Sequence, residues 1–161
     1  MTHRIAVENE QSSVTLPRGY KSLLRRAASL ALASGGFQRR GEIGVTLVEK
    51  AEIRRLNRTF RENDRETDVL SFPLSDDPFH PAPEDVVRGA VLLGYVIVCP
   101  AVLVAQAKDF GVSFREEMCR MVIHSVLHLL GYDHLKPKER KDMFALQEKV
   151  LADLKNETPL D

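Results

Sequence analysis

The apolar residues of this chain recur at two spacings along the sequence. A spacing of about 3.6 residues, which puts apolar side chains on one face of a helix, occurs in five stretches. Gly111 can end one of them, whereas Pro100 and Pro137 suit the first turn of a helix. The pattern predicts helices over residues 20–33, 49–60, 100–110, 114–130 and 137–154.

Alternating or continuous apolar runs predict four strands between these helices. Residues 91–98 are apolar at nearly every position, so we expect this strand at the centre of the sheet. Pro73 ends the run at 69–72, which places that strand near an edge or end of the sheet. Shorter strands are predicted at 4–7 and 42–48, and a long exposed loop at 75–88.

The predicted order of elements is β-α-β-α-β-β-α-α-α, which is typical of an α+β domain. We expect a small mixed β-sheet packed by about five helices, the helix at 114–130 being central. Ser113 and Glu116 form a capping box at the start of that helix. The 161 residues fit one domain, 1–161, in which the polar residues 155–161 are expected to form a frayed tail.

Composition restricts the classes of function that are open to the chain. Hydrophobic residues make up 43% and charged residues 29%, which is ordinary for a folded globular protein. The formal net charge is zero, so a nucleic-acid partner would have to bind a local basic patch. Cys99 and Cys119 are too few for a disulfide framework, and we expect both to be buried free thiols.

Two segments bear on where the protein works. The first residues of the chain lack the apolar core of a signal peptide. Residues 89–107 carry no charge, but Gly94 and Pro100 interrupt them, so a buried strand followed by a helix fits better than a membrane span. We therefore expect a cytoplasmic protein with no membrane partner.

Three of the five histidines, His124, His128 and His134, lie close together in the sequence. Residues four apart share one face of a helix, so His124 and His128 can point at one position. Gly131 can end the helix in a left-handed conformation and so return His134 to that position. Three imidazoles with an open fourth position suit one catalytic zinc ion per chain, whose bound water would have a pKa of about 7.

The residue that follows the first histidine decides which chemistry this metal would serve. The spacing equals that of the metzincin peptidases, H-E-x-x-H-x-x-G-x-x-H, but Ser125 replaces the glutamate that acts as their general base. Serine cannot act as this general base near neutral pH, so the motif indicates zinc hydrolysis that uses no glutamate at this position. RNA cleavage is one such reaction, because the leaving group is an alkoxide and not an amine. Asp68 and Asp133 are candidates to hold a ligand imidazole by its second nitrogen, although each also suits a turn or a helix end.

Phosphate chemistry also needs a cation facing the metal, to stabilise the charge of the transition state. Arg61 is the best candidate, because a guanidinium binds phosphate in a bidentate way. With Arg54, Arg58 and Arg65 it would form one basic stripe for RNA if the helix continued that far. A solvated arginine face explains the same spacing equally well.

Two stretches of the sequence together resemble the YbeY family. The members of this family are bacterial zinc endoribonucleases that mature small-subunit ribosomal RNA. They are residues 56–73, ending in Thr67-Asp-Val-Leu-Ser-Phe-Pro73, and residues 124–134, His124-Ser-Val-Leu-His128-Leu-Leu-Gly131-Tyr-Asp133-His134. The likeness extends over most of the chain and includes Gln106-Ala-Lys.

This resemblance implies that His124, His128 and His134 bind zinc and that Arg61 is the essential arginine near the metal. It implies a hydrolase that cleaves single-stranded RNA, takes part in ribosome quality control, and has the small ribosomal subunit or its associated factors as a partner. The chain departs from the family's pattern at Ser125, usually glycine, and at Tyr95, usually acidic. Two other functions stay open: a zinc peptidase or amidase, and a non-catalytic ribosome-binding protein with a structural zinc.

Overall fold

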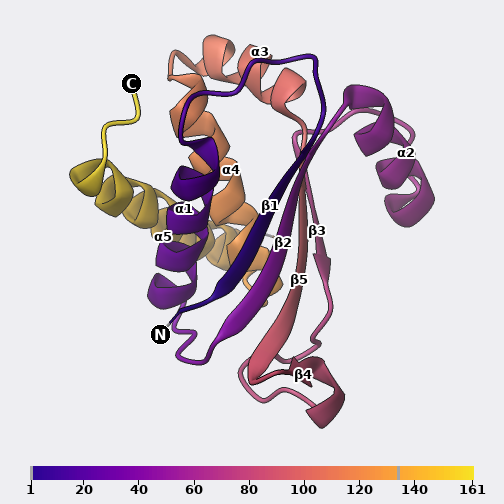
Figure 1. The fold of residues 1–161 in the computed structure, drawn as a ribbon, viewed down its shortest axis with the longest axis vertical. Coiled ribbons are helices and arrows are strands. Elements are labelled where there is room, and N and C mark those ends of the chain that lie inside the picture. Colours follow the sequence, from indigo (N-terminus) through magenta and orange to yellow (C-terminus); the bar gives the residue numbers. More distant parts are fainter. Residues whose placement is uncertain (1, 134) are drawn as a thin grey trace.

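The computed structural model describes residues 2–133 and 135–161 of the chain. Over these residues five strands and five α-helices form one α+β domain (Figure 1). The elements are β1 Arg4–Glu10, α1 Tyr20–Ser34, β2 Gly41–Val48, α2 Lys50–Arg61, β3 Val69–Pro73, β4 Val86–Val87, β5 Ala90–Val98, α3 Pro100–Phe110, α4 Phe114–Leu129 and α5 Pro137–Glu157. The predicted fold class is confirmed, and the order of elements differs from the predicted one by the additional short strand β4.

The sheet is mixed and has the order β1-β2-β5-β3, with β4 also pairing with β5. The pairs β1–β2 and β2–β5 are parallel, whereas β3 and β4 run antiparallel to β5. The apolar strand β5 lies between β2 and β3, as its composition predicted, and β3 with its terminal Pro73 lies at the edge.

Helices α1, α4 and α5 gather on one side of the sheet, and α4 is the one surrounded by other elements (Figure 1). Its apolar side chains, with those of α1 and α5 and one face of the strands, form the main core of the domain. Nine residues of α4 are buried, so packing and not helix propensity fixes its position.

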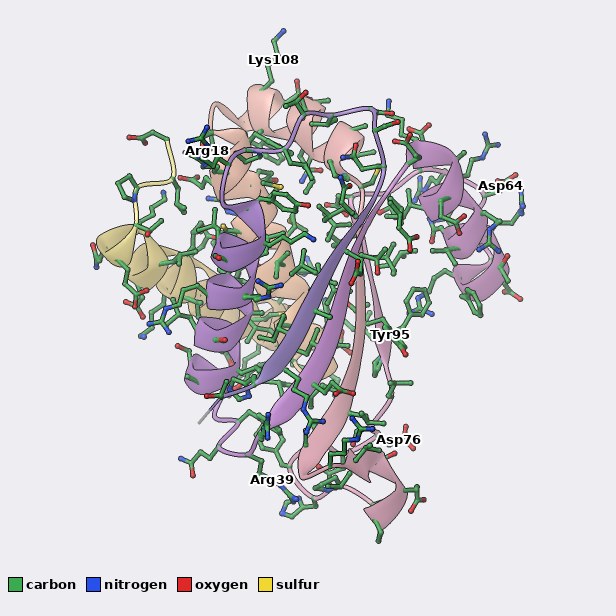
Figure 2. All side chains as sticks on the ribbon, in the orientation of Figure 1. Arg18, Arg39, Asp64, Asp76, Tyr95 and Lys108 are labelled. Atoms are coloured by element: carbon green, nitrogen blue, oxygen red, sulfur yellow. The ribbon has the colours of Figure 1, made fainter. Side chains whose placement is uncertain are left out.

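The other side of the sheet is covered only in part, because the short helix α2 lies over one end of it (Figure 1). A small second cluster of buried residues forms beneath α2, namely Val48, Ile53, Leu70 and Cys99. Next to this cluster the side chain of Tyr95 is half exposed, at 50%. Figure 2 shows Tyr95 on the α2 side of the sheet.

Glycine is required at one position of the central strand. Gly94 has φ 144°, and a Cβ atom there would lie 2.2 Å from the backbone oxygen of Phe72 on β3. No other residue allows β3 to approach β5 so closely.

Three expectations from the sequence were wrong in detail. The segment 75–88 is not all loop: it contains a 3-10 turn, Pro83–Asp85, and the short strand β4. The residues 155–161 are not a frayed tail, because α5 continues to Glu157 and Leu160 is buried, its carbonyl accepting a hydrogen bond from Ser113. The arginine stripe does not reach Arg65, because Glu62 adopts a left-handed conformation that ends α2.

The cysteines and the uncharged stretch behave as the sequence suggested. Cys99 and Cys119 are free and buried, and burial raises the pKa of the Cys119 thiol to about 12. The uncharged residues 89–107 divide between β5 and the start of α3. Within the described parts of the chain, no helix is both long and apolar enough to cross a membrane.

Candidate active site

The histidine pair lies on α4, with the geometry that its spacing predicted. The rings of His124 and His128 are 4.6 Å apart between centroids, and their Nε2 atoms face each other at 3.1 Å. Ser113 begins this helix by accepting a hydrogen bond from the Glu116 amide at 3.0 Å, which is one half of the expected capping box.

The end of α4 holds the ring of His128. Gly131, at φ 99°, donates its amide to the carbonyl of His128, and the next amide, from Tyr132, returns to the carbonyl of Leu127. This is a Schellman cap, and it brings the carbonyl of Tyr132 to 2.9 Å from Nδ1 of His128. The turn that ends the helix therefore also fixes the direction of this imidazole.

The ring of His124 is held from another helix. Oε1 of Gln147, on α5, lies 2.7 Å from Nδ1 of His124. The orientation of the amide is fixed because its nitrogen donates to the carboxylate of Glu148 at 3.1 Å. Since a carbonyl oxygen only accepts, we assign a hydrogen to Nδ1 of both His124 and His128, which leaves both Nε2 atoms with lone pairs.

These two lone pairs suit a shared metal ion. Two imidazole nitrogens bound to one tetrahedral zinc ion at about 2.0–2.1 Å would lie about 3.3–3.4 Å apart, close to the 3.1 Å between the Nε2 atoms. The third expected ligand, His134, lies outside the described residues. Among the described residues no cluster of three metal-binding side chains occurs, and of the three expected ligands the structure brings His124 and His128 together.

The opposite wall of the site carries Arg61, the last residue of α2. Its guanidinium donates to the carbonyl of Ser71 at 2.6 Å and to that of Phe60 at 3.2 Å, and it lies 4.8 Å from the ring centre of Phe72. Arg61 is exposed to solvent. Its contacts in the described part of the chain are neutral, so its charge is available to an anion.

One cleft of about 450 Å³ between α4 and the edge strand β3 is lined by His124, His128 and Arg61. The cleft brings together residues that are more than sixty positions apart in the sequence, as predicted from Arg61 and the histidine motif. Its lining also includes Asp68, Ser71, Pro73 and Met121.

The carboxylate of Asp68 makes local contacts in this cleft. One oxygen accepts the amide of Val69 at 2.7 Å and the hydroxyl of Thr67 at 3.2 Å, and the other accepts Gln106 at 3.3 Å. The second nitrogens of His124 and His128 are held by Gln147 and Tyr132 instead. The other candidate, Asp133, follows Tyr132 and is half-buried.

A chain of part-buried hydrogen bonds joins Asp68 to His124 behind the cleft. From Asp68 it passes to Gln106, which also donates to the buried Glu117 at 2.6 Å. Arg120 then binds Glu117 at 2.7 Å and Glu148 at 3.1 Å, and Glu148 holds the amide of Gln147. Burial alone would lower the pKa of Arg120, but its bonds to these carboxylates raise it. We call this chain of side chains the polar network.

The other three arginines of the predicted stripe lie away from the cleft. Arg54 and Arg58 both bind Asp64, at 2.9 Å and 3.7 Å, and the hydrogen bond from Arg54 lowers the pKa of that carboxyl. Arg65 follows the end of α2 and lines a shallow hollow with Arg54. Of the four arginines, only Arg61 is part of the cleft lining.

Gln147 and the polar network are the features that sequence reasoning missed. Gln147 lies at helical spacing between Met143 and Val150, on the buried face of α5. A polar residue on an otherwise apolar face was the available signal, because a buried amide needs a partner.

The fold and the cleft define a class, an α+β protein in which two imidazoles and one guanidinium line a single cleft. A family model described as Endoribonuclease YbeY matches residues 6–155. The chain therefore belongs to the YbeY family of endoribonucleases, as the sequence motifs indicated.

Individual relatives agree with this assignment over most of their lengths. The chain is 38% identical to the Endoribonuclease YbeY of Alkaliphilus metalliredigens, over 93% of this chain and 94% of that protein. It is 36% identical to that of Legionella pneumophila (strain Corby), over 100% and 96%. The solution structure of TM1509 from Thermotoga maritima matches with a TM-score of 0.61 and 33% identity, covering 95% of this chain and 90% of that one.

Proposed function

We propose that this protein is a zinc-dependent endoribonuclease that cleaves single-stranded RNA in the maturation and quality control of the small ribosomal subunit. The observation that carries the proposal is the placement of two imidazole Nε2 atoms and the Arg61 guanidinium around one cleft. Membership of the YbeY family supports RNA as the substrate class. Ribosomal RNA as substrate would place the enzyme in the cytoplasm, with the small subunit or its factors as partner.

His124 and His128 would hold the zinc ion through Nε2, and His134 is the third ligand by its spacing in the sequence. A bound zinc ion would supply Lewis acidity toward a phosphoryl oxygen and toward water. Gln147 and the carbonyl of Tyr132 keep the two rings aimed at one position. Such fixed hydrogen bonds raise the basicity of a ligand imidazole.

Arg61 would bind the scissile phosphate from the other side of the cleft. Two of its N–H groups donate to the carbonyls of Phe60 and Ser71. These neutral acceptors hold the guanidinium in position without neutralising its positive charge. A guanidinium held this way stabilises the negative charge that grows on phosphoryl oxygens in the transition state. Arg54, Arg58 and Arg65 would at most contact RNA outside the cleft.

The described residues of the cleft include no carboxylate that is available for proton transfer, which favours phosphodiester over peptide hydrolysis. Ser125, at the position of the metzincin glutamate, is fully buried and is not part of the cleft lining. Asp68 does line the cleft, but both of its oxygens accept hydrogen bonds from the protein. Proton transfer to a leaving amine therefore has no ready carboxylate among the described residues of the cleft.

The test is cleavage of one RNA sequence as a single strand and as a duplex by zinc-loaded protein. We expect the single strand to be cut and the duplex to survive. The product ends identify the nucleophile: a 5′-phosphate indicates water, and a 2′,3′-cyclic phosphate indicates the RNA 2′-hydroxyl. Cleavage of a generic peptide but of neither RNA would overturn the proposal in favour of a peptidase, and zinc binding without any cleavage would favour a structural zinc.

A further inference from the structure

Three aromatic side chains form a row on the sheet face opposite to the histidines. Tyr95 and Phe60 are 50% and 57% exposed, and Phe72 lies between them and is half-buried. Figure 2 shows Tyr95 on the α2 side of the sheet, whereas the histidines belong to α4 on the other side. We call these three residues the aromatic row.

The strand register puts the rings next to one another. Phe72 on β3 is paired with Tyr95 on β5, so their side chains share one face of the sheet at a Cβ separation of about 5 Å. The rings of Phe60 and Phe72 meet edge to face at 5.4 Å between centroids. On the other side of Tyr95 the paired residue is Gly44, where a Cβ would lie 2.9 Å from the tyrosine ring.

Arg61 connects the aromatic row to the cleft. Its guanidinium lies over the ring of Phe72, donates to the carbonyl of Ser71, and lines the cleft that holds the histidines. Ser71 and Phe72 are successive residues of β3, so their side chains point to opposite faces of the sheet. The hydroxyl of Ser71 indeed donates to a carbonyl of α4. β3 is an edge strand, so a ligand can pass from one face to the other over Arg61.

We propose that the aromatic row is a stacking platform for the bases of single-stranded RNA that extends out of the cleft. Exposed aromatic rings on neighbouring strands stack bases without regard to sequence, and an arginine over a ring adds a cation–π contact. Two cations lie along the row: Arg61 over the middle ring, that of Phe72, and Arg4 in a hollow with Tyr95, although Arg4 also pairs with Glu42 at 3.4 Å. The inference rests on the proposed function, because it takes RNA as the ligand of the cleft.

The experiment measures RNA affinity by fluorescence anisotropy in a His128→Ala background, so that turnover does not interfere. Phe60→Ala and Tyr95→Ala are each expected to weaken binding of an oligonucleotide of about twelve nucleotides roughly tenfold. Tyr95→Trp should keep the affinity, because it keeps a stacking surface, and Tyr95→Asp should weaken it at least as much as alanine. Phe110→Ala, which removes a 67% exposed ring on α3, is the matched control and should change nothing.

Ligand length separates the platform from the cleft itself. A dinucleotide, which can occupy the cleft alone, should bind equally well to the protein with or without Tyr95→Ala. Equal affinity of Phe60→Ala, Tyr95→Ala and Phe110→Ala for the longer RNA would overturn the platform. So would a Tyr95→Ala protein that keeps its RNA affinity but no longer binds purified small subunits, since the row would then bind a protein.

These outcomes are distinct from a failure of the proposed function. RNA that binds through the aromatic row but is not cut by the zinc-loaded parent protein would contradict the nuclease and leave the platform in place. RNA that is cut with an unchanged KM in Tyr95→Ala would contradict the platform and leave the nuclease in place.

Discussion

The imidazoles of His124 and His128 face the same cleft as the guanidinium of Arg61, but the two walls are held by different kinds of contacts. On the α4 wall each ring is fixed by a hydrogen bond to Nδ1, and the polar network lies behind His124. The opposite wall, which consists of β3 and the end of α2, is called the β3 wall. On it Arg61 is exposed, and its guanidinium is held by two backbone carbonyls and lies over one aromatic ring.

This difference corresponds to the different ligands that we propose for the two walls. A metal ion requires ligands held within a few tenths of an ångström, and orientation of each imidazole by a second contact supplies that precision. A phosphate group of a flexible RNA strand can be bound by a positive charge on a long side chain. An exposed guanidinium supplies this charge and does not have to be held as rigidly as a metal ligand. Substitutions in the α4 wall should therefore reduce metal binding, whereas substitutions in the β3 wall should reduce catalytic activity without reducing metal binding.

Removal of a ligand from the α4 wall is expected to have the largest effect. His128→Ala should bring both zinc content and RNA cleavage to the background level, because two imidazoles cannot retain the ion. Metal analysis and a cleavage assay on the same preparation check this. His80→Ala is the matched control, since His80 is exposed on a loop and pairs only with Asp77 among the described residues. Full cleavage by His128→Ala would show that the histidine cleft is not the site.

Removal of the cation from the β3 wall is expected to separate activity from metal content. Arg61→Ala should retain one zinc per chain and lose about a hundred- to a thousandfold in the rate of cleavage, as when one charge-stabilising donor is removed. Arg55→Ala on the same helix is the control, because Arg55 is exposed and pairs with Glu52. Loss of zinc from Arg61→Ala would make Arg61 a structural residue.

Removal of the contact behind His124 is expected to have a smaller effect on the metal. Gln147→Leu keeps the bulk of the side chain but removes the acceptor for Nδ1, which should weaken zinc binding about ten- to a hundredfold. Competition with a chelating dye measures the affinity. Val150→Ala, on the same buried face of α5, should lower thermal stability without changing zinc affinity. If both variants lower the affinity alike, Gln147 acts only through packing.

The smallest expected effect is on the pH dependence of stability. Burial alone would raise the pKa of Glu116, but hydrogen bonds from Lys155 and Arg120 outweigh it and place the pKa below its usual 4.5. The unfolded chain binds this proton more readily, so the stabilisation is present above pH 4.5 and is lost as the pH falls below it. Glu116→Gln should cost about 1–2 kcal/mol at neutral pH and flatten the acid side of the stability profile. Urea unfolding at several pH values checks this, and an unchanged acid limb would contradict it.

The sequence predicted those parts of the fold and the site that depend on local spacing. The four-residue interval of the histidines, Pro100 at a helix start and Gly111 at a helix end each act within one turn of helix, and the structure has them as expected. The apolar composition of β5 was sufficient to place it inside the sheet. The prediction that Arg61 lies in one site with the histidines came from two sequence motifs considered together.

What the sequence did not predict depends on contacts between distant elements. Gln147 meets His124 only because α5 packs against α4, and no local pattern specifies that contact. The end of α2 depends on the left-handed conformation of Glu62, which is uncommon for a residue other than glycine and has no strong local signal. Strand β4 has two residues and exists only through its pairing with β5.

The most direct test of the account is removal and stepwise return of zinc to the wild-type protein, with cleavage of a single-stranded RNA measured at each step. The metal-free protein is expected to be inactive, and the rate of cleavage is expected to rise in proportion to added zinc up to one ion per chain. Undiminished cleavage by the metal-free protein, or no cleavage at any zinc content, would contradict this expectation.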